Sequence, residues 1–213
     1  MTRREHAARI DALSSRYGTT FAEEIGIDVA KNQPAPLFQL LFASLLFSAR
    51  ISAQNAARAT RALIDAGLTT PHKMAQATWQ ERVDVITWHG YKRYDESTST
   101  RLGELAGDCL ERYRGDLRHL RDAAGRDVSA ERQRLMEFKG IGPLGADIFL
   151  REIQIAWDEV YPYADDRILT AAKRLGLPAD TQKLAELVPR EAFPRLVAAL
   201  IRVQLNKAYD EFT

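Results

Sequence analysis

The chain has 213 residues, of which 46% are apolar and 28% are charged, a profile typical of one globular domain or of two small ones that share a core. The formal net charge is +1, so any basic surface for an acidic partner must be local. The single cysteine, Cys109, excludes an internal disulfide and cannot by itself hold an iron–sulfur cluster or a structural zinc. We interpret Cys109 as a buried small hydrophobe rather than a reactive thiol.

The first residues predict helices. Thr2 with Glu5, and Thr20 with Glu23, have the spacing of capping boxes at helix starts. The segment "MTRREHAARIDALSSRYG" is charged throughout and lacks the apolar core of a signal peptide. No apolar run approaches the roughly 20 residues that span a bilayer. We therefore expect a cytoplasmic protein without a membrane partner, associated with the nucleoid if the protein is bacterial.

An apolar helix is expected next. "NQPAP" breaks the chain at residues 32–36, and "PLFQLLFASLLFSAR" is then apolar almost all round, as in the central helix of a bundle. Further helical segments, separated by Gly and Pro, lie at residues 52–67, 70–78, 79–90, 97–115, 117–125, 129–138, 165–177 and 190–212. No strand-like alternation occurs between them, so the sequence predicts an all-α fold.

The stretch "MEFKGIGPLGADIFL" predicts two helices joined by a very short turn. Gly140 and Gly142 allow the reversal because glycine adopts positive φ without steric cost. Pro143 suits the first turn of the second helix, and Ile141 would point back between the helices. The free N–H groups of the turn and of the new helix would face outward together as an anion site. Taken alone, such a turn is more often only structural.

The order of features resembles the helix-hairpin-helix DNA glycosylases related to endonuclease III. "FKGIGPLGADIFL" matches the hairpin of that superfamily, and "YPYADDRILTAAKRLGL" matches the segment with its aspartate and the helix that follows. Upstream, "PLFQLLFASLLFSARISAQNAARATRAL" and "ITWHGYKRYDESTSTRL" are similar to its first barrel helix and to its loop before the fourth helix. The resemblance covers the chain from about Pro34. It implies a helical barrel over residues 32–150 and a second, discontinuous subdomain made of residues 1–31 and 151–213.

Members of this family flip a base out of the duplex into a cleft between the two subdomains, where a carboxylate stabilises the positive charge that develops on the sugar. The resemblance implies that Asp165 is this carboxylate. Asp166 is the rival, because some alkyl-base glycosylases carry paired aspartates and use the second. A third interpretation is that one or both only cap the helix, since Asp is a preferred N-cap residue.

Two departures from the family pattern restrict the chemistry. Bifunctional members carry a lysine in the second hairpin helix that forms a Schiff base with C1′, and Leu144 occupies that position. Lys139 is a remote alternative nucleophile and a better candidate for a phosphate contact. Many relatives also carry four cysteines after the last helix, whereas this chain reads "NKAYDEFT" there. We therefore expect no iron–sulfur cluster and no other cofactor, apart from a structural monovalent cation held by the hairpin backbone at Phe138 and Gly140.

The resemblance also assigns contacts to double-stranded DNA. Arg50 lies where relatives insert a polar side chain into the vacated stack, although a surface arginine at a helix end is an equally good interpretation. The loop "HGYKRY" is either a base-stacking and phosphate-binding loop or a solvated one. Trp88 and Trp157 line a base pocket or belong to the core. The expected DNA contacts are Lys139, Gly140, Ile141, Gly142, Leu144, Gly145, Arg50, Tyr91, Lys92 and Arg93.

These features together predict a monomeric, monofunctional DNA N-glycosylase of base excision repair. Two alternatives stay open: a non-catalytic helix-hairpin-helix DNA-binding protein, and a glycosylase with weak lyase activity. The damaged base is not identifiable from the sequence, because pocket side chains come from several helices.

Overall fold

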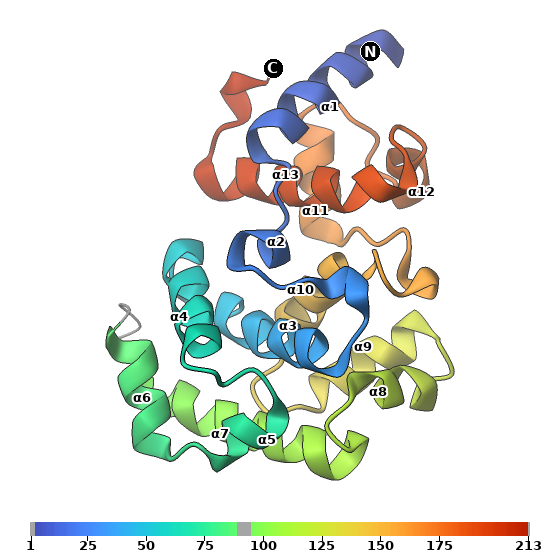
Figure 1. Cartoon of the computed structure of the whole chain (residues 1–213). Coiled ribbons are helices and arrows are strands. Elements are labelled where there is room, and N and C mark those ends of the chain that lie inside the picture. Colours follow the sequence, from blue (N-terminus) through green and yellow to red (C-terminus); the bar gives the residue numbers. More distant parts are fainter. Residues whose placement is uncertain (1–2, 89–94, 213) are drawn as a thin grey trace. The chain divides into compact units, whose positions relative to one another are not determined.

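The computed structural model describes residues 3–88 and 95–212 (Figure 1). Every regular element among them is a helix, and these residues contain no strand. The prediction of an all-α fold is therefore confirmed. None of the described helices is both long and apolar enough to cross a membrane.

The chain divides into two compact units. The terminal unit consists of Met1–Glu23 and Arg151–Thr213, and the internal unit consists of Glu24–Leu150. The internal unit thus begins at Glu24, ahead of residue 32, where the resemblance placed its start. The turn and the 3-10 helix that follow Glu24 belong to the internal unit.

The internal unit contains eight of the described α-helices and one 3-10 helix. They are η1 (Val29–Lys31), α3 (Pro34–Phe47), α4 (Ala53–Asp65), α5 (Pro71–Gln76), α6 (Trp79–Trp88), α7 (Asp95–Tyr113), α8 (Leu117–Ala123), α9 (Val128–Met136) and α10 (Pro143–Ile153), which ends in the terminal unit. Helix α3 packs against α4, α7 and α8, and α7 packs against α5 and α6. Figure 1 shows this arrangement.

Helix α3 is the apolar centre of the internal unit, as its sequence predicts. Its run from Leu40 to Leu46 is buried, and the rings of Phe38 and Phe42 meet edge to face at 5.5 Å. The one polar side chain within that run, Ser44, donates to the Leu40 carbonyl at 2.8 Å. A helix that is buried all round needs such internal satisfaction of its polar groups, because no water reaches them.

The terminal unit is built on three helices from both ends of the chain. Helices α1 and α11 pack on α13, and their shared core includes Leu13, Ile168 and Leu200. The elements are α1 (Arg3–Tyr17), α2 (Phe21–Ile25), η2 (Asp158–Val160), α11 (Asp166–Arg174), α12 (Thr181–Ala185), η3 (Arg190–Ala192), α13 (Phe193–Asn206) and η4 (Tyr209–Glu211).

The expected capping box at α2 is confirmed. The Thr20 N–H donates to Oε2 of Glu23 at 3.1 Å, and the Glu23 N–H donates to Oγ1 of Thr20 at 3.2 Å. A second carboxylate, that of Glu152, accepts from the N–H groups of Phe21 and Ala22. Burial raises the pKa of Glu152, so this cap has a desolvation cost. The predicted capping residue Thr2 lies outside the described residues.

The C-terminal segment differs from its prediction. A single helix over residues 190–212 is wrong, because Pro194 lies in the first turn of α13 and Lys207 ends it with a left-handed φ of 55°. The short helix α12 is not evident in the sequence either. It begins after Asp180, whose side chain accepts from the Lys183 N–H at 2.9 Å. Five residues are too few for a periodic pattern to be recognised.

Candidate active site

The hairpin joins α9 to α10 through a turn with a buried floor. Phe138 is fully buried and Ile141 is 3% exposed, and the Ile141 N–H donates to the Phe138 carbonyl at 3.0 Å. Ile141 therefore points inward, as expected. Gly140 has a φ of +94°, in the region that favours glycine. A Cβ at Gly140 would also lie 2.8 Å from Cδ1 of Leu45, so a side chain here would have to displace that of Leu45.

The predicted role of Gly142 is wrong in one respect. Gly142 does not have a positive φ, and a Cβ built on it meets no atom within 4 Å. Its carbonyl accepts the Ala146 N–H at 3.0 Å, so it stands immediately before α10, which begins at Pro143 as predicted. The N–H groups of Leu144 and Gly145 belong to the first turn, where an α-helix supplies no partner from within. The anion site expected at these groups stays a prediction.

Two contacts hold the hairpin helices in place. Arg132 of α9 donates from Nε to Oδ1 of Asp147 in α10 at 2.7 Å, an ion pair that is partly buried. At the start of α10, a Cβ on Gly145 would meet Cγ2 of Ile141 at 3.3 Å, so the glycine lets the turn lie close to the helix. The hairpin helices are thus joined both by an ion pair and by close packing at the turn.

Lys139 pairs with a carboxylate inside the internal unit. Its Nζ lies 2.5 Å from Oε1 of Glu104 in α7, and its side chain is 69% exposed. An exposed pair of this kind contributes little stability, so Lys139 can still turn to another anion. Its assignment as a phosphate contact stays a prediction.

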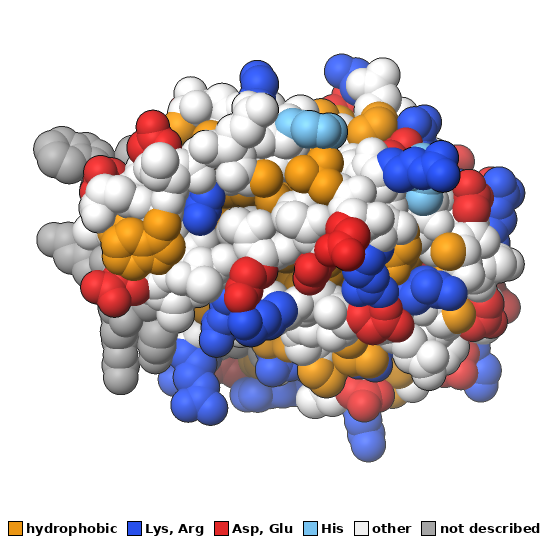
Figure 2. All heavy atoms as spheres, turned by 90° about the horizontal axis from the view of Figure 1, so that it is seen from below, with side chains coloured by type: hydrophobic (Ala, Val, Ile, Leu, Met, Phe, Trp, Pro, Cys, Tyr) orange, Lys and Arg blue, Asp and Glu red, His pale blue; other side chains and the backbone are white. Residues whose placement is uncertain are grey.

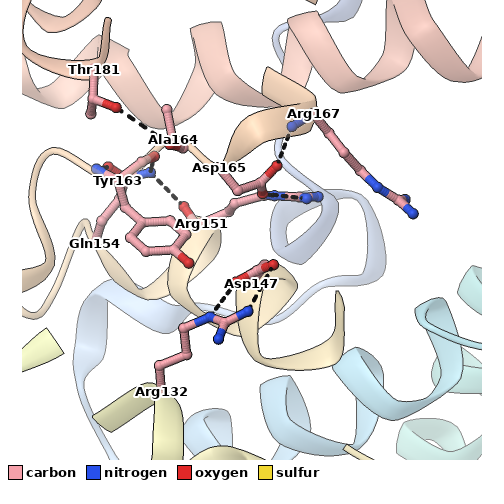
Figure 3. A network of polar contacts seen from close by, with 9 residues as sticks. All are labelled: Arg132, Asp147, Arg151, Gln154, Tyr163, Ala164, Asp165, Arg167 and Thr181. Atoms are coloured by element: carbon pink, nitrogen blue, oxygen red, sulfur yellow. Dashed lines mark hydrogen bonds and ion pairs between the residues drawn. The ribbon is translucent and has the colours of Figure 1, made fainter. Parts of the chain in front are cut away.

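Asp165 occupies the N-cap of α11 in extended backbone conformation. Its Oδ1 accepts from the Arg167 N–H at 2.9 Å, while its Oδ2 pairs with the guanidinium of Arg151 (Figure 3). The side chains of Asp165 and Arg151 are only 11% and 8% exposed. Both oxygens are therefore oriented, one by the helix and one by a buried cation. Asp166, the rival carboxylate, is the first residue of α11 and is exposed.

Gln154 fixes the segment that leads into Asp165. Its Oε1 accepts from the Tyr163 N–H at 2.9 Å, and its Nε2 donates to the carbonyls of Arg151 and Tyr163 at 2.8 Å and 3.3 Å. Thr181 donates to the Ala164 carbonyl at 3.3 Å, and the bond between Tyr161 and Pro162 is cis. Figure 3 shows the side-chain amide of Gln154 turned toward the backbone of Tyr163. The carboxylate is thus held through both its side chain and its backbone.

Sequence reasoning did not identify Arg151 or Gln154. Both lie in or just after α10, in the stretch "DIFLREIQIAW", where polar residues at helical spacing are typical of a solvated face. The sequence feature that could have identified them is the set of apolar residues on both sides, which predicts a buried segment. Residues as polar as these, placed between Phe149 and Trp157, are surrounded by core positions.

The sequence matches no protein-family model and no curated protein. Among solved structures, a trapped covalent endonuclease III–DNA intermediate aligns with 95% of this chain and 86% of its own, at 20% identity and a TM-score of 0.53. A non-covalent endonuclease III–DNA complex has the same coverage, 19% identity and a TM-score of 0.56. The H. pylori 3-methyladenine DNA glycosylase bound to 1,N6-ethenoadenine aligns over 95% of this chain and 98% of its own, at 16% identity and a TM-score of 0.55.

This chain has the helix-hairpin-helix DNA glycosylase fold. The expected fold is therefore confirmed over nearly the whole chain. Within it, the position expected for a Schiff-base lysine holds Leu144, in the first turn of α10. Among the described residues, no group of three His, Cys, Asp or Glu side chains is placed to hold a metal ion. The Phe138 carbonyl accepts one hydrogen bond, from the Ile141 N–H, and a carbonyl oxygen has a second lone pair. The monovalent cation expected at Phe138 and Gly140 stays a prediction.

The remaining candidates in this fold separate into three groups. Trp157 is fully buried, which confirms the core interpretation, and Cys109 is fully buried as expected, with burial raising the pKa of its thiol to about 12. Arg50 is exposed and follows α3. The loop residues Tyr91, Lys92 and Arg93 lie outside the described residues, as does the side chain of Trp88. The wedge and loop assignments therefore stay predictions.

Proposed function

We propose that this protein is a monofunctional DNA N-glycosylase of base excision repair, which excises a damaged or mismatched base from double-stranded DNA. The observation that carries the proposal is the buried Asp165 carboxylate, oriented by Arg151 and by the N-terminus of α11 in a glycosylase fold. Solved structures with this fold include an endonuclease III and a 3-methyladenine DNA glycosylase, with DNA or a modified base bound.

The proposed chemistry is hydrolysis of the N-glycosidic bond. As the bond to the base lengthens, positive charge develops at C1′ and the ring oxygen of the sugar, and a fixed carboxylate stabilises this charge without having to reorganise. Asp165 supplies the carboxylate. Water adds to C1′ and loses a proton, and the base leaves with the bonding electron pair and gains a proton. The products are a free base and an intact abasic strand.

Leu144 supports the assignment as a monofunctional enzyme. A leucine side chain has no amine, so it cannot form the imine with C1′ that precedes strand cleavage. Lys139 remains the alternative nucleophile, although its amine pairs with Glu104. We further propose that the protein acts as a monomer in the compartment that holds the DNA.

The decisive experiment offers the protein duplexes that contain uracil, an alkylated purine, an oxidised base or an abasic site. Base release is measured for the wild type, for Asp165→Asn and for Asp166→Asn. Asn keeps the N-cap of α11, so Asp165→Asn isolates the charge. We expect Asp165→Asn to lower base release by at least about 100-fold, and Asp166→Asn to lower it by less than about threefold.

Other outcomes identify the alternatives. Tight duplex binding without release from any substrate would favour the non-catalytic DNA-binding protein. Loss of release in Asp166→Asn alone would assign the chemistry to the exposed carboxylate instead. A borohydride-trapped adduct would contradict the monofunctional assignment.

A further inference from the structure

A pocket of about 360 Å³ lies beside the hairpin turn, entirely within the internal unit. Its walls come from the C-terminal end of α3, the first turns of α7 and the hairpin. The polar residues and the glycine that line it are Ser48, Arg50, Ser97, Thr98, Arg101 and Gly140. Two arginines, two serines and a threonine thus line one pocket, and its described lining includes no acidic residue.

Because position 140 is glycine, the side chain of Arg101 can lie close to the hairpin turn. A Cβ at Gly140 would lie 2.9 Å from Cδ of Arg101 and 3.4 Å from its Cγ. The aliphatic stem of Arg101 therefore lies directly on the backbone of the turn. A guanidinium on a packed stem loses less conformational freedom when it binds an anion than one on a free stem.

No described side chain of opposite charge lines this pocket. Elsewhere in the internal unit Arg132 pairs with Asp147, and Lys139 pairs with Glu104. Among the side chains that the structure describes, which leave out that of Asp95, neither Arg50 nor Arg101 makes a hydrogen bond or an ion pair. Figure 2 shows one face of the molecule, on which basic and acidic side chains are mixed. Guanidinium groups beside hydroxyl groups and without a carboxylate suit a phosphate.

We propose that this pocket binds a backbone phosphate of duplex DNA, with Arg101 as its principal contact. The inference rests on the proposed function, because that function brings DNA to the hairpin. Gly140 belongs to both the turn and the pocket, so a strand that meets the N–H groups of the hairpin passes beside Arg101. The resemblance assigned Arg50 to the vacated base stack, whereas the pocket gives Arg50 a second phosphate-directed role.

The test is the salt dependence of binding to an undamaged duplex, measured by fluorescence anisotropy for the wild type, Arg101→Gln, Arg101→Lys and Lys73→Gln. Each phosphate contact to B-DNA contributes about 0.9 to the slope of log K against log salt. We expect Arg101→Gln to lower the slope by about 0.9, which is about a fivefold loss of affinity at roughly 0.15 M salt relative to 1 M. Arg101→Lys keeps the charge and should keep the slope.

Lys73→Gln is the matched control, because Lys73 is exposed on α5, lies outside the pocket and carries the same charge. It should leave the slope unchanged. An unchanged slope in Arg101→Gln, or an equal fall in Lys73→Gln, would overturn the inference. Arg50→Gln gives an independent reading if Arg101→Gln unfolds, with an expected fall of the same size.

Failure of this inference and failure of the proposed function are distinguishable. Base release is measured on the same protein preparations. Release by the wild type together with an unchanged Arg101→Gln slope overturns the phosphate pocket and leaves the glycosylase assignment in place. A wild-type protein that neither binds duplex DNA nor releases a base overturns both.

Discussion

Replacing Arg151 by methionine should destabilise the protein strongly, because it leaves a buried carboxylate without its partner. In the wild type the side chains of Arg151 and Asp165 are 8% and 11% exposed, so little water can replace the guanidinium. Methionine matches the length of the arginine stem and adds no clash. Oδ1 of Asp165 keeps its hydrogen bond from the Arg167 N–H, so the cap of α11 survives the change.

The magnitude follows from the burial of this pair. Removing one partner of a buried ion pair costs about 3–5 kcal/mol. In a protein of this size each kcal/mol shifts the unfolding midpoint by about 2–4 °C, so the expected fall is about 6–20 °C. Small domains are stable by about 5–15 kcal/mol, and the variant should therefore remain folded in the cold.

The assay is urea and thermal unfolding followed by circular dichroism, with Arg190→Met as the matched control. Arg190 also pairs with an aspartate of the terminal unit, Asp158, but those side chains are 46% and 85% exposed. An exposed pair contributes about 0–1 kcal/mol, so the control should unfold close to the wild type. The double variant Arg151→Met/Asp165→Asn should recover most of the loss, since no charge stays buried and asparagine keeps the N-cap of α11.

One result would refute this reasoning directly. If Arg151→Met unfolds within about 1 kcal/mol of Arg190→Met, the pair is solvated and Arg151 does not orient the carboxylate. The same variant also bears on the proposed function. Base release should fall with Arg151→Met even at temperatures where the variant is fully folded, because Asp165 loses one of its two positioning contacts.

Three further predictions address the hairpin, the α2 cap and the lyase chemistry. Gly140→Ala should cost more than about 1–2 kcal/mol, because the left-handed φ and the contact with Arg101 oppose a Cβ, whereas Gly142→Ala should unfold nearly like the wild type. A similar cost for both would contradict the geometry of the turn. For Glu152, whose pKa is raised above its ordinary value of 4.5, the native state binds the proton more tightly than the unfolded state. The free energy of unfolding of the wild type, relative to Glu152→Gln, should therefore rise as the pH falls from 7 toward 4.5, and urea titrations that find it falling would refute this. Because Leu144 replaces the amine, abasic strands should stay intact until alkali is added, as a denaturing gel can test.

Local chemistry explains why most helices were predictable. Apolar periodicity and the Gly and Pro residues between segments act within a few residues of the chain, so they are readable without a fold. The apolar run of α3 implied burial on every side, and the pair Thr20 and Glu23 implied a cap. Predictions were wrong where the local pattern was too short or ambiguous. Helix α12 has only five residues, and the ends of α13 depend on Pro194 and Lys207.

The sequence by itself determined an all-α chain with a glycine-containing hairpin, a leucine in the lysine position and a pair of candidate carboxylates. Tertiary structure alone decided how one carboxylate is held. Arg151 pairs with Asp165, Gln154 clamps Tyr163, and Arg101 lies on Gly140. Each of these contacts joins residues that are nine or more positions apart along the chain, so none of them shows in a local pattern. A polar residue on a helix has the same local pattern whether it faces water or a buried partner, and only packing distinguishes the two.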